Sequence, residues 1–163
     1  MVMKSVRTQS IKNNPSMAEG ADKFDCYQKS VQDPEHEIDV FDIAFREAYG
    51  KEPISLREDF CGTFAVSCEW VKSHKKRWGI AVDICSDTLQ WGVHNNQSKL
   101  KPEASKRIEV LNQDVRSNTK RLVHVLAAQN FSFWIFKTRK KVVDYFRIVL
   151  RNLDKQGIVV LDM

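Results

Sequence analysis

The sequence predicts an α/β fold in which helices cover both faces of an open, mostly parallel sheet. Strand-like and helix-like segments alternate along the chain from about residue 54 onward. Several of the strand-like segments are wholly apolar, which is typical of parallel strands buried on both faces. Alternation of this kind favours connections that return each strand parallel to the one before it. A length of 163 residues fits one domain of this class.

Local signals predict the individual elements. The clearest helix begins at Asp33-Pro34, where Asp33 supplies a cap and Pro34 suits the first turn, and Gly50 ends it. Another helix is expected after residue 85, with Ser86 or Asp87 as its cap. The remaining helices are expected at 64–73 and 142–153, and the strands at 54–60, 79–82, 108–111, 122–128 and 157–161.

The N-terminal segment differs from the rest of the chain. Residues 1–21 are polar, contain Pro15 and Gly20, and show no sustained hydrophobic period. We therefore expect a disordered tail over residues 1–21 and a folded domain over residues 22–163.

The charge balance is mildly basic, with 26 Lys and Arg against 21 Asp and Glu and a net charge of +5. Its short clusters, Lys75-Lys76-Arg77 and Arg139-Lys140-Lys141, are interpreted as solvated faces, so charge alone does not indicate a nucleic-acid partner. No stretch approaches the roughly 18 apolar residues of a membrane span, and no apolar segment follows the basic N-terminus as in a secretory signal. We expect no membrane partner and a cytoplasmic location.

Several reactive or bulky side chains are predicted to be structural. The cysteines form no CxxC pair, and they make no zinc pattern with the histidines, so we expect neither a disulfide nor a metal site. Cys61 is interpreted as a small packed residue because no histidine stands near it to generate a thiolate. The large aromatic residues expected in the core are Trp70, Trp91, Phe131 and Trp134.

Polar residues stand where the expected strands end. Asp59, Asp83, Asp114 and Asn130 each lie at or just after such an end. In open parallel sheets, ligands bind at the carboxyl ends of the strands, so these side chains predict a ligand site. Asp83 follows Gly62 by 21 residues. That spacing is close to the roughly 20 residues between a nucleotide-binding glycine turn and the acid that binds a ribose.

The first loop of this site favours a cationic ligand. It contains a single glycine, Gly62, and follows the acids Glu58 and Asp59. A pyrophosphate would be repelled there, which disfavours a nicotinamide-dependent oxidoreductase, and the phosphate-binding pattern GxxxxGK[ST] is absent from the sequence. S-adenosylmethionine fits the loop because it combines an adenosine with a positive sulfonium and a positive α-amino group.

Five segments of the chain resemble one branch of the class I S-adenosylmethionine-dependent methyltransferases, which have a Rossmann-like sheet. The most specific segment is SLREDFCGT over residues 55–63, and the resemblance covers about residues 22–163. The other segments are YQKSVQ (27–32), CEWV (68–71), GIAVD (79–83) and NFSFWIFKT (130–138). The resemblance implies S-adenosylmethionine as cofactor and methyl transfer as the reaction, with the acceptor unidentified.

Roles for individual residues follow from this resemblance. The first cofactor loop, with Asp59, Cys61, Gly62 and Thr63, would meet the methionine moiety, and Arg57 would pair with its carboxylate. Asp83 would hold the ribose, Ile84 would flank the adenine, and Asp114 and Val115 would meet the adenine edge. Asn130 would lie beside the transferring methyl, where its carbonyl could aim an amine; the alternative is that it caps the turn after its strand.

Two departures from the family pattern shape the remaining expectations. The first loop lacks the form E/D-x-G-x-G-x-G. The chain also ends after the fifth strand of a sheet that has seven strands in this family. We therefore expect a domain with its C-terminal strands missing and self-association through an exposed sheet edge. The alternative to an active methyltransferase is a truncated or degenerate fragment without activity.

Overall fold

The computed structural model describes residues 17–18 and 20–162. The expected tail over residues 1–21 therefore lies almost wholly outside the described residues. A short helix that the sequence analysis did not identify, α1 (Lys23–Val31), opens the described fold. The carboxylate of Asp22 caps α1 by accepting hydrogen bonds from the backbone N–H groups of Phe24 (2.9 Å) and Asp25 (3.2 Å).

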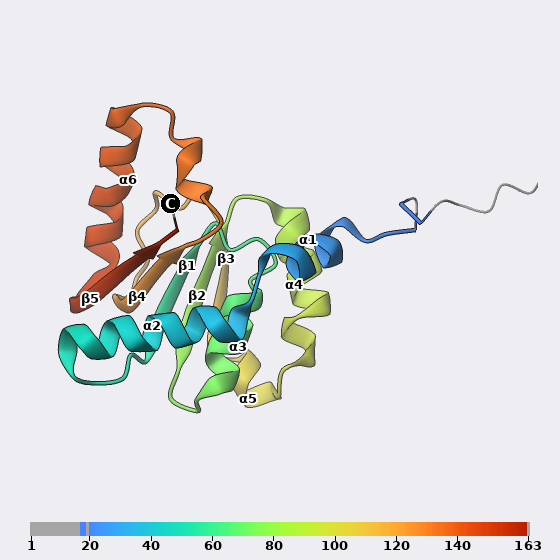
Figure 1. Cartoon of the computed structure of the whole chain (residues 1–163), viewed down its shortest axis with the longest axis horizontal. Helices are drawn as coiled ribbons and strands as arrows, with labels where there is room; N and C mark the ends of the chain where they lie inside the picture. The colour runs from blue at the N-terminus through green and yellow to red at the C-terminus, as the bar shows by residue number, and fades with distance from the viewer. Residues whose placement is uncertain (1–16, 19, 163) are drawn as a thin grey trace, which may run out of the picture.

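Five parallel strands form one sheet in the order β3-β2-β1-β4-β5 (Figure 1). The strands are β1 (Ser55–Asp59), β2 (Trp78–Asp83), β3 (Ile108–Asn112), β4 (Val123–Ala128) and β5 (Leu153–Leu161). The first strand is central, and the chain moves outward from it in one direction through β2 and β3 and in the other through β4 and β5. The predicted fold class, an open parallel sheet of Rossmann-like type, is confirmed.

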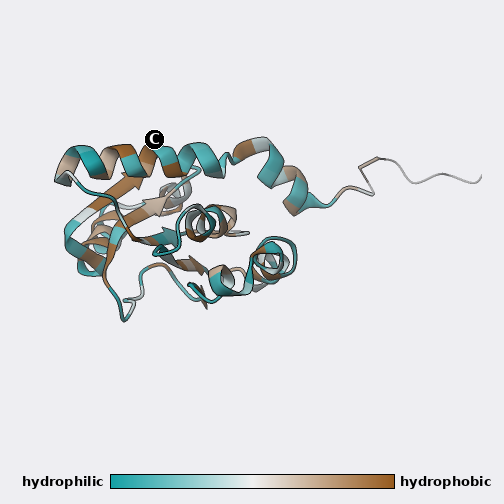
Figure 2. Cartoon of the chain, turned by 90° about the horizontal axis from the view of Figure 1, so that it is seen from below, coloured by the Kyte–Doolittle hydropathy of each residue, from teal (hydrophilic) through white to brown (hydrophobic). Residues whose placement is uncertain are grey.

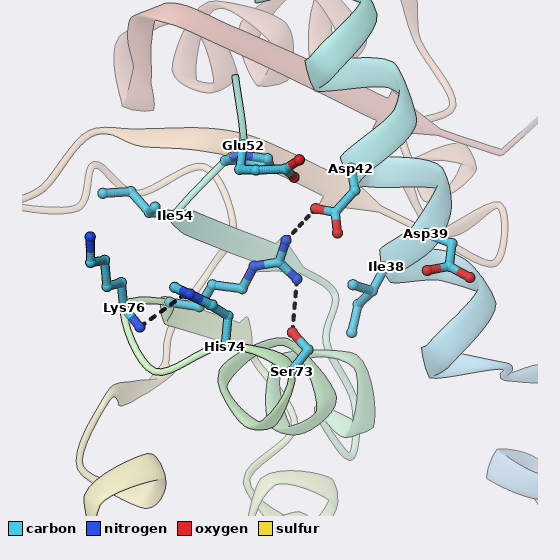
Figure 3. A pocket seen from close by; sticks show the side chains of 10 residues that line it. Ile38, Asp39, Asp42, Glu52, Ile54, Ser73, His74 and Lys76 are labelled. Atoms are coloured by element: carbon cyan, nitrogen blue, oxygen red, sulfur yellow. Dashed lines mark hydrogen bonds and ion pairs between the residues drawn. The ribbon is translucent and has the colours of Figure 1, made fainter. Parts of the chain in front are cut away.

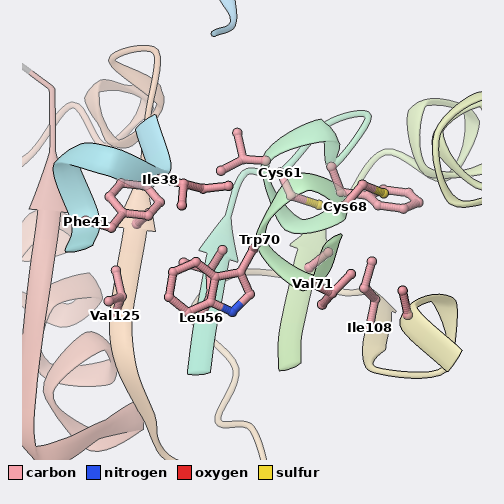
Figure 4. Close-up of a cluster of buried hydrophobic side chains, with 14 of the residues drawn as sticks. Ile38, Phe41, Leu56, Cys61, Cys68, Trp70, Val71, Ile108 and Val125 are labelled. Atoms are coloured by element: carbon pink, nitrogen blue, oxygen red, sulfur yellow. The ribbon is translucent and has the colours of Figure 1, made fainter. Parts of the chain in front are cut away.

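Helices cover the two faces of the sheet unequally. On one face, a hydrophobic cluster joins the sheet to α2 (Pro34–Tyr49), α3 (Ala65–Ser73), α4 (Ser86–Asn95) and α5 (Pro102–Ser105). Trp70 is fully buried at the centre of this cluster, among Leu56 and Phe41 (Figure 4). The other face is covered by α6 (Arg139–Asn152), which contributes Tyr145 and Val149 to a second cluster. Figure 2 shows apolar residues on the strands and alternation of polar and apolar residues along the helices.

The helix ends confirm some expectations and correct others. Asp33 caps α2 by accepting from the N–H of His36, and Gly50 ends it in the left-handed region, at φ 67°. The expected cap of α4 was wrong, because its N-cap is Cys85 and no side chain caps it. Thr138 caps α6, so this helix begins three residues before the expected Val142.

The last strand begins earlier than predicted. It follows α6 directly at Leu153, not at Gly157. Its pairing with β4 shifts between Val123↔Leu153 and Val125↔Ile158, so the residues between form a bulge around Gly157. The sequence of the bulge is polar, so the hydrophobic pattern does not predict the first half of the strand.

Two of the aromatic residues expected in the core lie on the surface. Phe131 is 55% exposed and Trp134 is 57% exposed. The expectation was wrong because Asn130 and Phe131 both adopt left-handed conformations, with φ 56° and 54°, immediately after β4. This turn directs the short helix η2 (Ser132–Ile135) out over the end of the sheet instead of into its core. Trp91 is half-buried, and its indole N–H donates to Asp22 (2.6 Å).

The unpaired side of the outer strand β5 leads us to expect self-association. Within the described residues β5 pairs with β4 alone, and its second half is the apolar run Gly157–Leu161. Unpaired N–H and C=O groups on an apolar edge favour pairing with another chain. We expect the light-scattering mass of the 163-residue chain to rise with protein concentration. A monomer mass that stays constant over a hundredfold concentration range would contradict this expectation.

Candidate functional site

The strand ends at which the sequence predicts the site are all carboxyl ends, and they lie along the same side of the sheet. Parallel register places Asp59 beside Val82, and Asp83 beside Asn112. The loops that follow β1, β2, β3 and β4 therefore border one another at the carboxyl ends of the strands. Nine of the ten residues predicted for the site belong to these strand ends and loops, and Arg57 lies in the middle of β1; the nine are Asp59, Cys61, Gly62, Thr63, Asp83, Ile84, Asp114, Val115 and Asn130.

The first loop is tightly wound. Phe60, Gly62 and Phe64 all adopt left-handed backbone conformations, with φ of 57°, 53° and 45°. Glycine enters this region without steric cost, whereas each phenylalanine costs on the order of 1–2 kcal/mol. The N–H of Phe64 donates to the carbonyl of Cys61 (2.7 Å), and the buried Phe64 ring anchors the start of α3. Backbone strain of this kind concentrates at ligand-binding loops.

Asp83 ties the first loop to the second. One carboxylate oxygen accepts from the N–H of Gly62 (2.8 Å), and the other accepts from the N–H of Cys85 (2.8 Å). A carboxylate has about four acceptor positions, so two bonds leave capacity for hydroxyl donors from a ligand. Asp83 is half-buried and can accept them from the open side. The sequence predicted this residue as a ligand acceptor but gave no sign that it also holds Gly62.

Arg57 and Asp59 are buried partners on the face covered by α6. Arg57 donates from Nε to Asp59 (2.6 Å) and from its two terminal nitrogens to the carbonyls of Val115 (2.6 Å) and Ser117 (3.1 Å). The Tyr145 hydroxyl donates to the other oxygen of Asp59 (2.9 Å). Both charged side chains have 0% exposure. In this conformation Arg57 connects β1 to the loop after β3, and contact of either residue with a ligand stays a prediction.

Glu58 points to the opposite face, a feature that the sequence analysis did not use. Its carboxylate accepts from the N–H of Ser67 (2.9 Å) and from the Ser67 hydroxyl (2.5 Å) at the start of α3. Burial raises the pKa of Glu58 to about 8. Successive residues of a strand point to opposite faces, so the position of Glu58 between Arg57 and Asp59 already contained this signal.

A small cavity lies beside these loops. It has a volume of about 110 Å³ and brings together three predicted residues, Ile84, Asp114 and Val115, with aromatic residues that were not predicted. Its other lining residues are Phe60, Arg116, Ile135 and Phe136. Whole small-molecule sites measure about 300–1,000 Å³, so this cavity suits one ring of a larger ligand.

Asp114 is held at the rim of the cavity by Arg116. The Asp114 carboxylate accepts from the backbone N–H (2.8 Å) and Nε (2.9 Å) of Arg116, and pairs with its terminal nitrogen (2.5 Å). The hydrogen bond from the Arg116 side chain lowers the pKa of Asp114, so this carboxylate is ionised at neutral pH. The site thus places an acid next to an apolar cavity.

Cys61 and Thr63 are buried within the first loop. Burial raises the pKa of the Cys61 thiol, so it is not a reactive thiolate, in agreement with the structural role predicted for it. The Thr63 hydroxyl donates to Gln28 of α1 (2.8 Å). Asn96 donates both to Gln28 (2.9 Å) and to the Thr63 carbonyl (2.9 Å), so α1 and the end of α4 are fastened to this loop.

Asn130 lies in the turn after β4, on the side of β1 opposite to β2. The backbone N–H groups of Asn130 (2.5 Å) and Phe131 (2.8 Å) both donate to Asp162, just beyond β5. The side-chain amide of the adjacent Gln129 donates to Glu37 of α2 (3.3 Å), and its side-chain oxygen is buried without a hydrogen-bond partner in the described part of the chain. Burial raises the pKa of Glu37. Asn130 therefore lies beside a polar group of residues from α2, β4 and the end of β5.

A larger hollow at the opposite edge of the sheet has no unpaired buried charge. It measures about 430 Å³ and lies where β1 and β2 begin (Figure 3). Arg77 is buried there, in an ion pair with Asp42 and a hydrogen bond to the Ser73 hydroxyl (2.8 Å). Its guanidinium also lies over the Trp70 ring, 4.0 Å from the centroid. These contacts satisfy Arg77, so the hollow carries no chemistry of its own.

Two kinds of feature are absent from the described residues. No group of three or more histidine, cysteine or acidic side chains is placed to hold a metal ion. None of the described helices combines the length and the apolar character that crossing a bilayer requires.

Solved methyltransferase structures share this fold. The sugar N-methyltransferase KedS8 from Streptoalloteichus sp. ATCC 53650 superposes with a TM-score of 0.68 at 16% identity, over 99% of this chain and 60% of that one. An S-adenosylmethionine-dependent methyltransferase from Clostridium acetobutylicum ATCC 824 gives 0.67 at 19% identity, over 86% and 54%. The plantazolicin methyltransferase BpumL in complex with SAH gives 0.66 at 13% identity, over 85% and 51%.

These matches establish the fold and its extent. The chain has the α/β fold of these methyltransferases and spans about half to three-fifths of the length of their chains. Neither a protein-family model nor a curated protein sequence matches it.

The buried Glu58 predicts a pH-dependent stability. Its pKa is about 8 in the folded chain against an ordinary value of 4.5, so the folded state retains a proton that the unfolded state releases. The contribution of Glu58 to the free energy of unfolding is fully present below about pH 4.5. It is lost as pH rises to about 8, and the free energy of unfolding falls by at most about 1.4 kcal/mol per pH unit. We expect Glu58→Gln to remove this loss when urea unfolding is compared at pH 5.5 and 7.5. Glu47→Gln, at an exposed position of α2, should leave the pH profile unchanged. Identical profiles for the wild type and Glu58→Gln would show that Glu58 is ionised in the folded chain.

Proposed function

We propose that this chain binds S-adenosylmethionine at the carboxyl edge of its sheet and transfers the methyl group to an acceptor. The observation that carries the proposal is the position of Asp83, which holds the Gly62 N–H and lies next to a cavity sized for one ring. The shared fold of solved methyltransferases supports the same cofactor. The chain's own residues fit it, because apolar and acidic groups stand where an adenosine and a cation would need them.

The adenosine half of the cofactor is assigned to the second and third loops. Ile84, which is 72% exposed, and the buried Val115 form apolar walls of the cavity for the adenine ring. Asp114, ionised at the rim, accepts from an exocyclic amine such as that of adenine. Asp83 accepts from the ribose hydroxyls with the acceptor positions that Gly62 and Cys85 leave free.

The methionine half is assigned to the first loop, where backbone groups around Gly62 approach the ligand. Arg57 and Asp59 serve as positioning residues in this proposal, because both are buried and satisfied by each other, by Tyr145 and by the loop after β3. The carboxylate of Asp83 beside this loop favours a positive sulfonium and amino group over a phosphate.

Methyl transfer is an in-line displacement, so the main contribution of the protein is to position the acceptor against the sulfonium carbon. The sulfonium supplies the leaving group when the cofactor is bound. Asn130 is the candidate for aiming the acceptor, because the two hydrogen bonds from its turn to Asp162 fix its backbone. Its side chain takes part in no hydrogen bond with the described residues, which favours an acceptor role over capping of its own turn. We assign no general base.

We expect Asp83→Ala to weaken binding of S-adenosylhomocysteine about 10- to 150-fold in a calorimetric titration. The change removes a charge-assisted acceptor whose loss costs roughly 1.5–3 kcal/mol. Asp87→Ala, at an exposed position of α4, is the matched control and should bind like the wild type.

A second variant separates ligand contact from loop integrity. Ile84→Asp places a charge on the exposed wall of the cavity and should weaken binding with no change in melting temperature. Wild-type binding of NADH without binding of S-adenosylhomocysteine would overturn the proposed cofactor. Absence of binding to either would favour a fragment without activity.

Asn130→Ala should separate positioning from structure. We expect a large loss of tritium transfer from labelled S-adenosylmethionine to a protein-free cell extract, with affinity for S-adenosylhomocysteine nearly unchanged. A lower melting temperature with unchanged transfer per folded molecule would instead assign Asn130 to the turn and remove it from the site.

A further inference from the structure

We propose that a basic groove at the amino edge of the sheet, opposite the candidate site, binds the phosphate backbone of a single-stranded nucleic acid. The basic groove consists of Lys76, Lys106, Arg107 and Arg121 around Trp78. This second site is independent of the methyl-transfer proposal, because its residues lie where the strands begin.

The parallel arrangement of the strands brings the basic residues of the groove together. Basic pairs precede three of the strands: Lys76-Arg77 stands directly before β2 and Lys106-Arg107 directly before β3, while Leu122 separates Lys120-Arg121 from β4. Parallel strands begin at the same edge, so these pairs, which are far apart in the chain, converge. Four cationic side chains from three loops line one groove of about 400 Å³, and Glu109 is the single acid among its lining residues.

Internal contacts fix the framework of the groove and leave its outer charges free. Arg107 clamps two of the loops: it donates to the carbonyls of His74 (2.9 Å) and Val71 (2.7 Å), and also to that of Arg77. Lys76 and Lys106 are exposed, and none of the ion pairs among the described residues involves them. The groove therefore presents a positive surface in which the charges of Lys76 and Lys106 take part in no ion pair with a described residue.

A stacked pair favours a nucleic acid over a simple anion. The Arg121 guanidinium lies 3.4 Å from the centroid of the Trp78 ring and is itself on an exposed side chain. A guanidinium plane held in this way is a surface on which an unpaired base can stack, and the surrounding lysines can follow the phosphates. Bases are available for stacking in a single strand and not within a duplex. A concave groove also suits a flexible strand better than a flat membrane surface.

Fluorescence anisotropy with a labelled 15-nucleotide oligothymidylate tests the groove on the full chain. With up to four phosphates neutralised, log K should fall with log salt with a slope of about −3, equivalent to roughly a 50-fold loss between 50 and 200 mM salt. The double variant Lys106→Glu and Arg121→Glu should weaken binding at least 10-fold and reduce the slope by about half. The matched control reverses Lys140 and Lys141 on α6, which changes the net charge equally, and should bind within twofold of the wild type.

Four results would overturn the proposal. Equal weakening by the α6 control would show that net charge alone binds the oligonucleotide. Competition by S-adenosylhomocysteine would place the strand at the opposite edge. Tighter binding to a duplex of the same length, or to vesicles containing phosphatidylserine, would assign the groove to another partner. If Arg121→Glu lowers the melting temperature by disturbing Trp78, Lys76→Glu with Lys106→Glu replaces it, because both lysines are exposed.

Discussion

The fixed geometry of this molecule depends on three consecutive ionisable residues in its central strand. Arg57, Glu58 and Asp59 are buried in β1, and the alternation of the strand sends the first and third to one face and the second to the other. Burying ionisable groups is costly unless each finds a partner, so Asp59 engages Arg57 and Tyr145, while Glu58, which retains its proton, engages Ser67. These contacts fix α6, α3 and the loop after β3 relative to the central strand.

The candidate site is built outward from that fixed strand. Arg57 holds the carbonyls of Val115 and Ser117, so the third loop is anchored by a residue of the first strand. Asp83 then holds the first loop from the second strand through Gly62. A ligand at this edge would meet loops whose positions are already set, which reduces the ordering cost of binding. The strained backbone at Phe60 and Phe64 is tolerated because these contacts over-determine it.

Acidic and basic residues are distributed unequally between the two ends of the strands. Acids stand at the carboxyl ends of β1 and β2 and shortly after β3, whereas basic pairs stand before β2, β3 and β4. The net charge of +5 conceals this separation because it sums over both edges. Under the two proposals, a cationic cofactor binds at the carboxyl ends of the strands and a polyanion binds in the basic groove, so the two ligands would not compete.

The sequence determined the parallel α/β fold, most of the strand positions and the placing of the candidate site residues at the carboxyl ends of the strands. Apolar runs, caps and strand-end acids are local signals, and a parallel sheet converts them into one edge by necessity. The tertiary structure alone decided that Arg57 is enclosed, that Phe131 and Trp134 face outward, and that β5 begins at Leu153. Each of these depends on a partner distant in the chain or on a left-handed turn at a residue other than glycine. Distant partners and left-handed turns of this kind do not appear in the hydrophobic pattern of the sequence. The contacts that stabilise them form only when the sheet brings Val115, Ser117 and Asp162 to their places.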